Sequence, residues 1–251
     1  MADVHLLDKT RRLLRLLHLS TSGKVIFSDI CQVLCGILDS KVFIISRKGK
    51  VLGTCDKDFL PVLDLLEDKV GSFVDEDFLE RLLNVLSTKE NVLLSSLGFT
   101  DKKLQTCRGI ITPIVIGGKR FGSLFMYKAS GEYDIDDIIL AEYGATVVGL
   151  ELLRSVNEEK DESQRRKLQA KNALECLSIT EKKSVCCVLS KLDGFEGMLN
   201  ASLIAKEHGI TRSVIVNALR KLESSGAIVT RSAGVKGTYV KVVNKSLLDL
   251  I

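Results

Sequence analysis

Four side chains suited to reading DNA recur along one face of a predicted helix in the last quarter of the chain. Arg220 can donate hydrogen bonds to guanine edges or phosphate, Asn217 can pair with adenine, and Val216 can pack on a thymine methyl. Ser213 and the helix N-terminus can bind phosphate through hydroxyl and backbone N–H groups. A solvated basic helix has a similar composition, so this face alone leaves both interpretations open.

Two helices joined by a tight turn must position this face. A short helix is expected over residues 202–208 and ends at Gly209, and Thr211 is expected to cap a second helix that runs to about Ser224. The apolar residues of the second helix gather on the side opposite the four polar-face residues. Two helices with a short glycine turn between them predict a helix-turn-helix.

A basic hairpin follows the two helices. Residues 227–231 predict a strand, residues 232–237 a glycine-containing turn, and residues 238–243 the return strand. The order helix, turn, helix and basic hairpin is that of a winged helix-turn-helix, which favours DNA binding over a merely solvated face. The predicted DNA-binding residues are Ser202, Thr211, Arg212, Ser213, Val216, Asn217, Arg220, Lys221, Ser232, Lys236, Thr238 and Tyr239.

The excess positive charge of the chain lies in this same part of the sequence. The 251 residues carry 36 basic and 32 acidic side chains, a formal net charge of +4. Residues 172–251 hold 11 of the basic and 7 of the acidic side chains, so they account for the whole excess. A local basic excess is the composition expected of a phosphate-binding surface.

Several other classes of protein lack the residues they need. The seven cysteines form no Cys-x-x-Cys pair and no cluster with histidine, so neither a disulfide framework nor a metal site is expected. Cys31 and Cys35 share a helix face but have apolar neighbours, which favours core packing over metal binding. No apolar run reaches the roughly 18 residues that span a bilayer, so no membrane segment is expected and a cytoplasmic protein is predicted.

The residues before the basic segment predict a sensor domain of mixed structure. Two hairpins are expected, at residues 42–54 and 109–127, and the second turns on Gly117-Gly118. Helices packed on a small antiparallel sheet indicate an α+β domain of the GAF or PAS type. Helical periodicity occurs at about residues 6–19, 27–38, 59–67 and 75–86.

A long helix is predicted to follow the sensor domain. Residues 138–153 are largely apolar and residues 154–171 almost wholly polar. A helix that buries its first half and exposes its second half suits a connector, although the second half could also pair with a partner helix. The expected domains are therefore residues 1–133 for the sensor, 134–171 for the linker helix and 172–251 for the winged helix-turn-helix.

The run Gly209-Ile-Thr-Arg-Ser-Val-Ile-Val-Asn-Ala-Leu-Arg-Lys-Leu-Glu-Ser224 resembles the helix-turn-helix of the CodY family, nutritional repressors of low-GC Gram-positive bacteria. The resemblance implies a GAF domain, a long linker helix, a winged helix and a homodimer. It also implies a global regulator, mainly a repressor, of genes for nutrient limitation and amino-acid metabolism. Such a regulator binds an AT-rich palindrome in double-stranded DNA, one half-site per subunit. Further blocks resemble the family in order at residues 8–11, 46–50, 140–149, 231–232, 236–239 and 242.

The resemblance implies two effectors rather than a catalytic cofactor. The family's GTP positions fall on Phe27, Ser46, Arg47, Lys48 and Glu151, where Lys48 would offer charge to phosphates and Glu151 would accept from guanine N1 and N2. No phosphate-binding loop of the G-x-x-x-x-G-K-[ST] type occurs, so GTP would be sensed rather than hydrolysed by that chemistry.

Of the two implied effector sites, the site for isoleucine, valine or leucine matches the family's residues less well. It comprises Phe59, Pro61, Leu65 and Phe73, but residues 56–70 contain no arginine to pair with the effector carboxylate. Two alternatives therefore stay open. One is the same DNA-binding role with the branched-chain amino-acid response lost or another small ligand sensed. The other is a nucleotide-processing enzyme, for which no catalytic acid, base or nucleophile set is evident.

Overall fold

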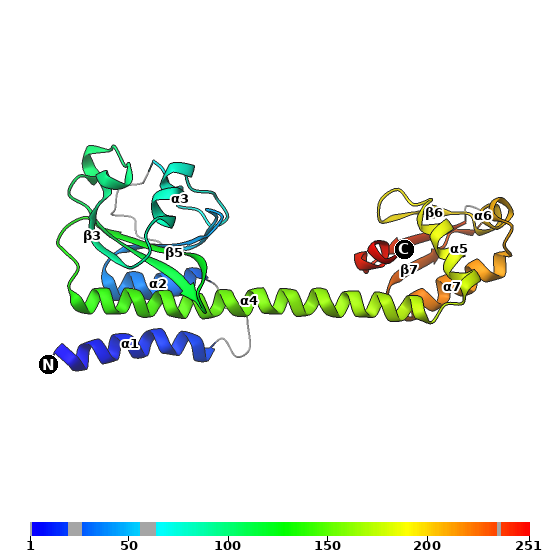
Figure 1. Cartoon of the computed structure of the whole chain (residues 1–251), viewed down its shortest axis with the longest axis horizontal. Coiled ribbons are helices and arrows are strands. Elements are labelled where there is room, and N and C mark those ends of the chain that lie inside the picture. The colour runs from blue at the N-terminus through cyan, green and yellow to red at the C-terminus, as the bar shows by residue number, and fades with distance from the viewer. Residues whose placement is uncertain (1, 20–26, 56–63, 235–236) are drawn as a thin grey trace. The chain divides into compact units, whose positions relative to one another are not determined.

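A computed structural model describes residues 2–19, 27–55, 64–234 and 237–251 of the chain (Figure 1). These residues divide into unit 1, Met1–Val156, and unit 2, Asn157–Ile251. Each unit has its own core of buried apolar side chains, two layers of core in unit 1 and one in unit 2. One helix, α4 (Ile135–Glu175), contributes to both units.

An antiparallel sheet of five strands forms the centre of unit 1, in the order β2-β1-β5-β4-β3. Both predicted hairpins are confirmed, since β1 pairs with β2 and β4 pairs with β5. The edge strand β3 was not predicted, because its sequence KENVL is half polar and its side chains are exposed or half-buried. The strands are β1 (Lys41–Ser46), β2 (Val51–Thr54), β3 (Lys89–Leu93), β4 (Arg108–Ile116) and β5 (Lys119–Lys128).

Helices cover both faces of this sheet because alternate strand residues are apolar on both sides. Val42 and Ile44 of β1 face a core shared with α2 (Phe27–Leu38) and the first half of α4. Phe43 and Ile45 face a second core, which is covered by α3 (Glu76–Leu83) and two short 3-10 turns, η2 (Leu94–Leu97) and η3 (Lys102–Leu104). Helix α1 (Ala2–Leu19) contacts α2 and adds Leu13 to the first core.

Two of the predicted helices of unit 1 differ from the structure. Helix α3 ends at Leu83, short of the predicted Leu86, and begins after Asp75, whose carboxylate accepts hydrogen bonds from the amides of Asp77 and Phe78. The helix predicted at 59–67 lies mostly outside the described residues, and its described part, residues 64–67, is not helical.

Unit 2 is a helical domain with a three-stranded antiparallel sheet in the order β6-β8-β7. The predicted helix-turn-helix and the hairpin after it are present, with boundaries within one residue or so of those expected. Strand β6 was not predicted, because it is only four residues long and contains a glycine. The elements are α5 (Ile179–Leu189), β6 (Glu196–Leu199), α6 (Ala201–His208), α7 (Arg212–Ser224), β7 (Ile228–Ser232), β8 (Thr238–Val242) and the 3-10 helix η5 (Lys245–Leu250).

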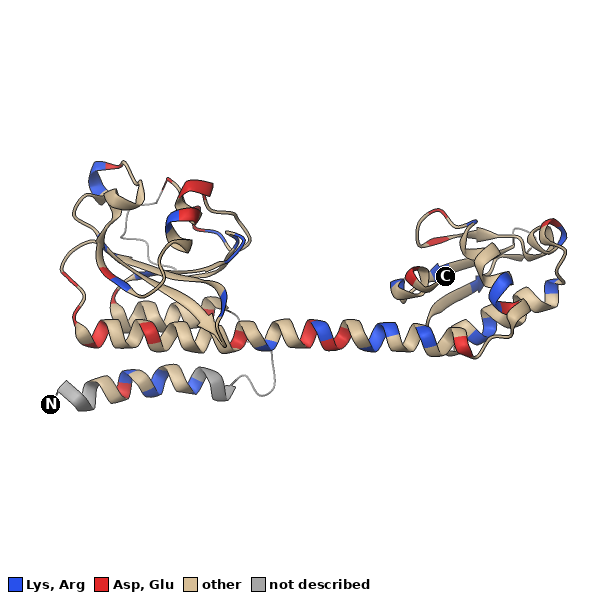
Figure 2. Ribbon diagram, in the orientation of Figure 1, with Lys and Arg blue, Asp and Glu red and all other residues tan. Residues whose placement is uncertain are grey.

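Helix α4 changes from buried to exposed along its length, as predicted. Its first half buries residues such as Leu140 and Val148 in unit 1, and burial resumes at Ala170 and Ala173 in the core of unit 2. Every position from 157 to 169 is exposed, and in this stretch a mainly acidic segment is followed by a basic one (Figure 2). The helix continues to Glu175, past the predicted end of the linker at residue 171.

Candidate DNA-binding and effector sites

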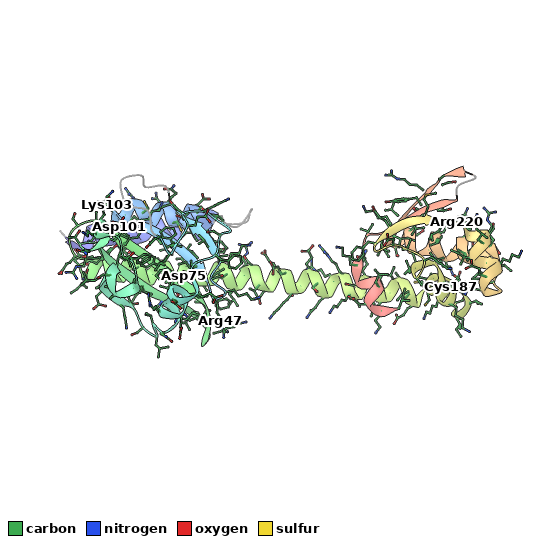
Figure 3. The ribbon with its side chains drawn as sticks, turned by 90° about the horizontal axis from the view of Figure 1, so that it is seen from above. Arg47, Asp75, Asp101, Lys103, Cys187 and Arg220 are labelled. Atoms are coloured by element: carbon green, nitrogen blue, oxygen red, sulfur yellow. The ribbon has the colours of Figure 1, made fainter. Side chains whose placement is uncertain are left out.

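Helix α7 presents a polar face to solvent and buries the opposite face. Ile215, Ala218, Leu219 and Leu222 lie in the core of unit 2. Arg220 is exposed and labelled on unit 2 in Figure 3. The rest of the predicted contact face is also accessible: Arg212, Ser213 and Asn217 are exposed, and Val216 is half-buried. The predicted buried and accessible faces of α7 are thus confirmed, while the DNA contacts themselves stay a prediction.

The turn before α7 depends on a glycine and leaves the helix start uncapped. Gly209 ends α6 with a left-handed φ of +65°, a conformation that a residue with a side chain rarely adopts. Thr211 occupies the N-cap position, but its hydroxyl bonds the Ser213 hydroxyl at 3.0 Å and caps no backbone amide. The expected side-chain cap is therefore absent, which keeps the first amides of α7 available to a phosphate.

A carboxylate that no sequence pattern indicated joins the far end of α7 to the sheet. Glu223 accepts a 2.7 Å hydrogen bond from the Thr230 amide and hydrogen bonds of 2.9 and 3.0 Å from the Thr230 hydroxyl. This arrangement joins α7 to β7 and so fixes the start of the hairpin relative to the helix.

Lys221, which is predicted to contact DNA, also has hydrogen-bond partners within the domain. Its ammonium donates to a Glu181 carboxylate oxygen at 2.8 Å and to the Cys176 carbonyl at 3.4 Å. Glu181 also completes a capping box with Ser178 at the start of α5. The hydrogen bond from Lys221, followed by that from the Ser178 amide, lowers the pKa of the Glu181 carboxyl below its usual value.

Strands β7 and β8 form the hairpin, or wing, that follows α7. Ser232 pairs with Thr238, and Arg231 pairs with Tyr239. Lys236 lies outside the described residues. The turn is shaped by two glycines with positive φ, Gly234 and Gly237, and is closed by a 2.9 Å bond from the Ala233 amide to the Gly237 carbonyl. Ser202, the remaining predicted contact, is exposed on α6.

A cluster on the sheet gives unit 2 an acid-sensitive contact. Lys241 lies 2.8 Å from a Glu196 carboxylate oxygen, and Tyr239 also hydrogen-bonds this carboxylate. These hydrogen bonds, that from Lys241 first, lower the pKa of the Glu196 carboxyl below its usual 4.5. Tyr239 therefore has a partner in the free protein, beside its predicted role at DNA.

Replacing Glu196 by glutamine should lower the stability of unit 2 in a pH-dependent way. A lowered pKa in the folded state stabilises the fold above the ordinary glutamate value, and this contribution is lost as the pH falls through the lowered value. Thermal unfolding of wild type and Glu196→Gln should thus differ at pH 7, and the difference should shrink from about pH 4.5 downward and vanish once the pH is below the lowered pKa of Glu196. A difference that stays constant from pH 7 to pH 3 would contradict the assignment.

The predicted GTP positions lie on elements that meet at one end of the sheet in unit 1. Ser46 ends β1 opposite Gly122, and the exposed Arg47 and Lys48 form the turn that follows. On α4, two residues before the buried Glu151, Gly149 is tightly packed on Ile114 and Ile116 at the end of β4. Ile116 pairs with Lys119 at the start of β5, and Ser46 pairs with Gly122 on the same strand. The turn after β1 and this part of α4 therefore lie near each other.

Phe27 approaches the same hairpin from α2. A Cβ atom added at Gly53 of β2 would lie 2.7 Å from the Phe27 backbone, so only glycine permits this close contact. Phe27 packs against the first core, as do Phe121 and Leu152. The Ser46 hydroxyl accepts a 2.9 Å hydrogen bond from the Lys50 amide, which holds the turn in shape.

The predicted amino-acid site is only partly assembled among the described residues. Leu65 packs against the second core, whereas Phe73 is 66% exposed and bridges Lys50 at the edge of the sheet. Phe59 and Pro61 lie outside the described residues. On the same face the structure reveals a buried cation that the sequence analysis missed. Lys41 is paired with Asp68 and also donates to the Cys55 carbonyl.

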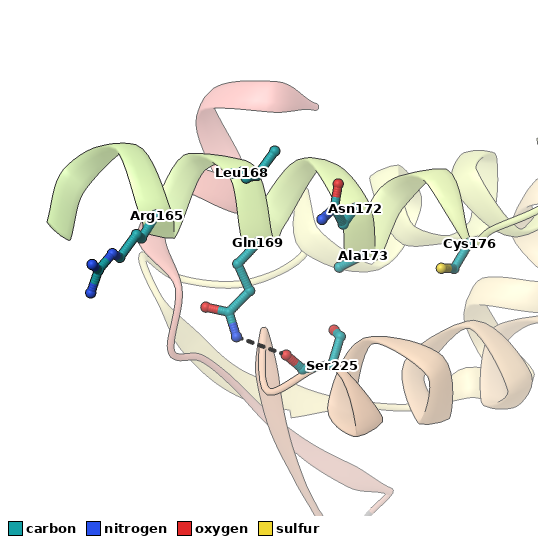
Figure 4. Close-up of a pocket in the computed structure, with 7 residues that line it drawn as sticks. All are labelled: Arg165, Leu168, Gln169, Asn172, Ala173, Cys176 and Ser225. Carbon is teal, nitrogen blue, oxygen red and sulfur yellow. Dashed lines mark hydrogen bonds between the residues drawn. The ribbon is translucent and has the colours of Figure 1, made fainter. Parts of the chain in front are cut away.

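An apolar-lined groove of about 340 Å³ runs beside the last turns of α4 in unit 2 (Figure 4). Leu168, Ala173 and Cys176 supply apolar surface, and the Gln169 amide bonds the Ser225 carbonyl at 3.1 Å across the groove. Residues 165, 168, 172 and 176 recur at helical spacing on this side of α4.

Within residues 2–19, 27–55, 64–234 and 237–251, no three histidine, cysteine or acidic side chains come together as ligands for a metal ion. None of the helices in these ranges combines the length and the apolar character needed to cross a membrane.

Known proteins resemble the chain over almost its whole length. Residues 5–176 match the CodY GAF-like domain, and residues 195–251 match the CodY helix-turn-helix domain. The global transcriptional regulator CodY of Geobacillus kaustophilus is 41% identical over 254 residues, covering 98% of this chain and 97% of that protein. The protein of the same name from Caldanaerobacter subterraneus subsp. tengcongensis is 43% identical over 245 residues, covering 97% and 96%.

A solved structure is also similar. It is the cofactor-binding GAF domain of the nutrient sensor CodY from Clostridium difficile, 30% identical, with a TM-score of 0.45; the match covers 58% of this chain and 96% of that one. The two family matches confirm the predicted α+β architecture of GAF domain and helix-turn-helix domain.

Proposed function

The chain belongs to the CodY family, and from this premise we propose that it is a DNA-binding global transcriptional regulator controlled by small effectors. Its relatives carry the name of transcriptional regulators and not of enzymes, and the chain has the same two domains. In this proposal residues 1–133 sense effectors, residues 134–171 connect, and residues 172–251 bind DNA in the cytoplasm. Mainly, the protein represses genes of nutrient limitation and amino-acid metabolism.

The observation that carries the DNA-binding part is the exposed face of α7. Asn217 and Arg220 lie one turn apart on a helix whose other face is buried, as a helix in the major groove requires. The uncapped start of α7, with Arg212 and Ser213, suits a backbone phosphate. The proposed contacts from the neighbouring elements are Ser202, Ser232, Lys236, Thr238 and Tyr239.

We propose a homodimer that binds an AT-rich palindrome in double-stranded DNA. A two-fold dimer places one recognition helix in each half-site of a symmetric sequence. The groove of Figure 4 supports a partner helix on α4, because Leu168 is 60% exposed within a stripe at helical spacing. Sedimentation should accordingly give the mass of two chains.

A binding assay with effectors tests the whole proposal. The full-length protein is titrated against a fluorescent AT-rich palindromic duplex and against a scrambled duplex. Each titration is made with and without GTP and isoleucine at about 1 mM. Specific binding that changes with an effector supports the proposal. Equal affinity for the two duplexes under every condition would overturn it.

GTP is the effector that the positions in unit 1 favour most. Lys48→Ala should weaken GTP binding about tenfold or more, since a hydrogen bond to a charged group contributes about 1.5–3 kcal/mol. The substitution lies in an exposed turn, so the fold should be kept. Calorimetric titration measures the change. Lys103→Ala is the matched control because Lys103 is also exposed and lies far from Arg47 in unit 1 (Figure 3). Equal effects of the two substitutions would refute the site.

A second candidate keeps the DNA-binding role but removes the response to isoleucine, valine and leucine, or replaces it with another small ligand. It is favoured by the absence of arginine from residues 56–70 and by the exposed Phe73. Placing a carboxylate in an apolar pocket without a cation costs several kcal/mol. Saturable binding of isoleucine in the same calorimeter would exclude this candidate.

A further inference from the structure

A single lysine joins the recognition helix to two other elements of unit 2. The Lys221 ammonium lies 2.8 Å from an oxygen of Glu181 in α5 and 3.4 Å from the carbonyl of Cys176, the residue after α4. All three residues belong to unit 2. The end of α4, the start of α5 and the last turn of α7 therefore meet at this ammonium group.

Glu181 is held in place independently of the lysine. The same carboxylate oxygen accepts a 2.7 Å hydrogen bond from the Ser178 amide, and the Ser178 hydroxyl accepts a 3.2 Å bond from the Glu181 amide. This capping box fixes the carboxylate to the first turn of α5. Lys221 thus binds an acceptor whose position is already set.

The burial of Glu181 makes the ion pair structurally demanding. Its side chain is 10% exposed, whereas that of Lys221 is 47% exposed. A carboxylate removed from water needs a cation or several hydrogen-bond donors, and leaving it unpaired is costly. The pair therefore constrains where Lys221, and the helix that carries it, can lie.

Lys221 directly follows Arg220 and lies one helical turn beyond Asn217. A small rotation of α7 about its own axis would move these two groove-facing side chains together with Lys221. Ile215 and Leu222 fix the buried side of α7 by apolar packing, which is not directional. A hydrogen-bonded ion pair supplies the directional constraint that this packing lacks.

We propose that Lys221 is a positioning residue for DNA recognition. Through Glu181 it fixes the rotation of α7 relative to α5 and the end of α4, and it does not itself act as a phosphate ligand. The inference rests on the proposed DNA-binding function. It replaces the expectation from sequence that Lys221 contacts DNA, and it gives the end of α4 a direct contact with the recognition helix.

A double-mutant cycle separates the two roles because they predict opposite signs for Glu181→Gln. A phosphate-binding Lys221 would be released by Glu181→Gln, and one negative charge would leave the DNA-binding domain, so affinity should rise. A positioning Lys221 would lose its anchor, so affinity for the palindrome should fall. Binding is measured for wild type, Lys221→Gln, Glu181→Gln and the double variant across several salt concentrations.

We expect each single substitution to weaken binding to the palindrome by about 3- to 30-fold, and the double variant to be no weaker than either, as coupled neighbours behave. The slope of log affinity against log salt should stay as in wild type, and Lys221→Arg should restore most of the loss. A slope reduced by about one in Lys221→Gln, with unchanged or tighter binding by Glu181→Gln, would overturn the proposal.

Two controls keep the outcome decisive. Lys191→Gln and Glu207→Gln remove a more exposed pair, 3.0 Å apart, whose two residues lie outside α7, and should leave discrimination between palindrome and scrambled duplex unchanged. If Glu181→Gln lowers the helical content, the Lys221 variants decide alone through the salt slope and the arginine rescue. Failure of wild type to prefer the palindrome would refute the proposed function, whereas failure of the cycle alone would refute only this inference.

Discussion

Arg220→Ala is expected to weaken binding of the palindromic duplex by about 1–3 kcal/mol, the usual cost of losing an arginine that contacts a base edge. Arg220 is exposed on α7, and its neighbours Ala218, Leu219 and Leu222 are buried, so the substitution should leave the fold intact. Affinity for palindromic and scrambled duplexes, measured at several salt concentrations, gives both the loss and its sequence dependence.

The control for Arg220 is Lys182→Ala, which removes the same charge from an exposed position on α5. Losing one charge outside the predicted contact residues should weaken the binding of both duplexes slightly and equally. If Arg220 reads bases, Arg220→Ala should weaken binding of the palindrome more than binding of the scrambled duplex. If Arg220 binds phosphate, it should weaken binding of both duplexes equally. Affinity and salt slope equal to wild type would remove α7 from the proposed interface.

Gly237→Ala is expected to destabilise unit 2 by about 2–6 kcal/mol and to abolish preferential binding of the palindrome. Gly237 has a φ of +109°, and an added Cβ would lie 2.3 Å from the carbonyl oxygen of Leu199 at the end of β6. The strain and the overlap together would push the wing away from β6. Circular dichroism during urea unfolding measures the stability, and the duplex titration measures the binding.

Gly234→Ala is the matched control in the same turn. Gly234 also has a positive φ, +62°, but an added Cβ would meet nothing within 4 Å. Alanine there carries only the left-handed backbone cost of about 1–2 kcal/mol. If the two variants unfold at the same urea concentration, the close contact with Leu199 is not what restricts Gly237.

Features set by local sequence were predicted well. Three features depend only on residues that are close together in the sequence: the turn at Gly209, the apolar side of α7 and the hairpin turn at Gly117-Gly118. Their patterns therefore identify the element without knowledge of the rest of the fold. The family resemblance added the order of the domains, which local patterns do not contain.

Features set by residues distant in the sequence were missed. Strands β3 and β6 are short and partly polar, and pairing with β4 and β8 defines them. The contact of Lys221 with Glu181 spans 40 residues, so a helical wheel placed the lysine beside the groove without showing its partner. The effector positions are the hardest case, because an exposed turn such as Arg47-Lys48 has the same sequence whether or not it binds a phosphate.

The stretch of α4 from residue 157 to 169 has a consequence for how the protein unfolds. Isolated helices of this length are marginal in water because the first turn is costly to form. Here the buried turns at Val148 and at Ala170 and Ala173 act as nuclei on either side, and the exposed stretch propagates between them. Melting of either unit removes one nucleus and frays the shared helix toward the other. We therefore expect the unfolding of the two cores to be coupled through a segment that buries almost nothing.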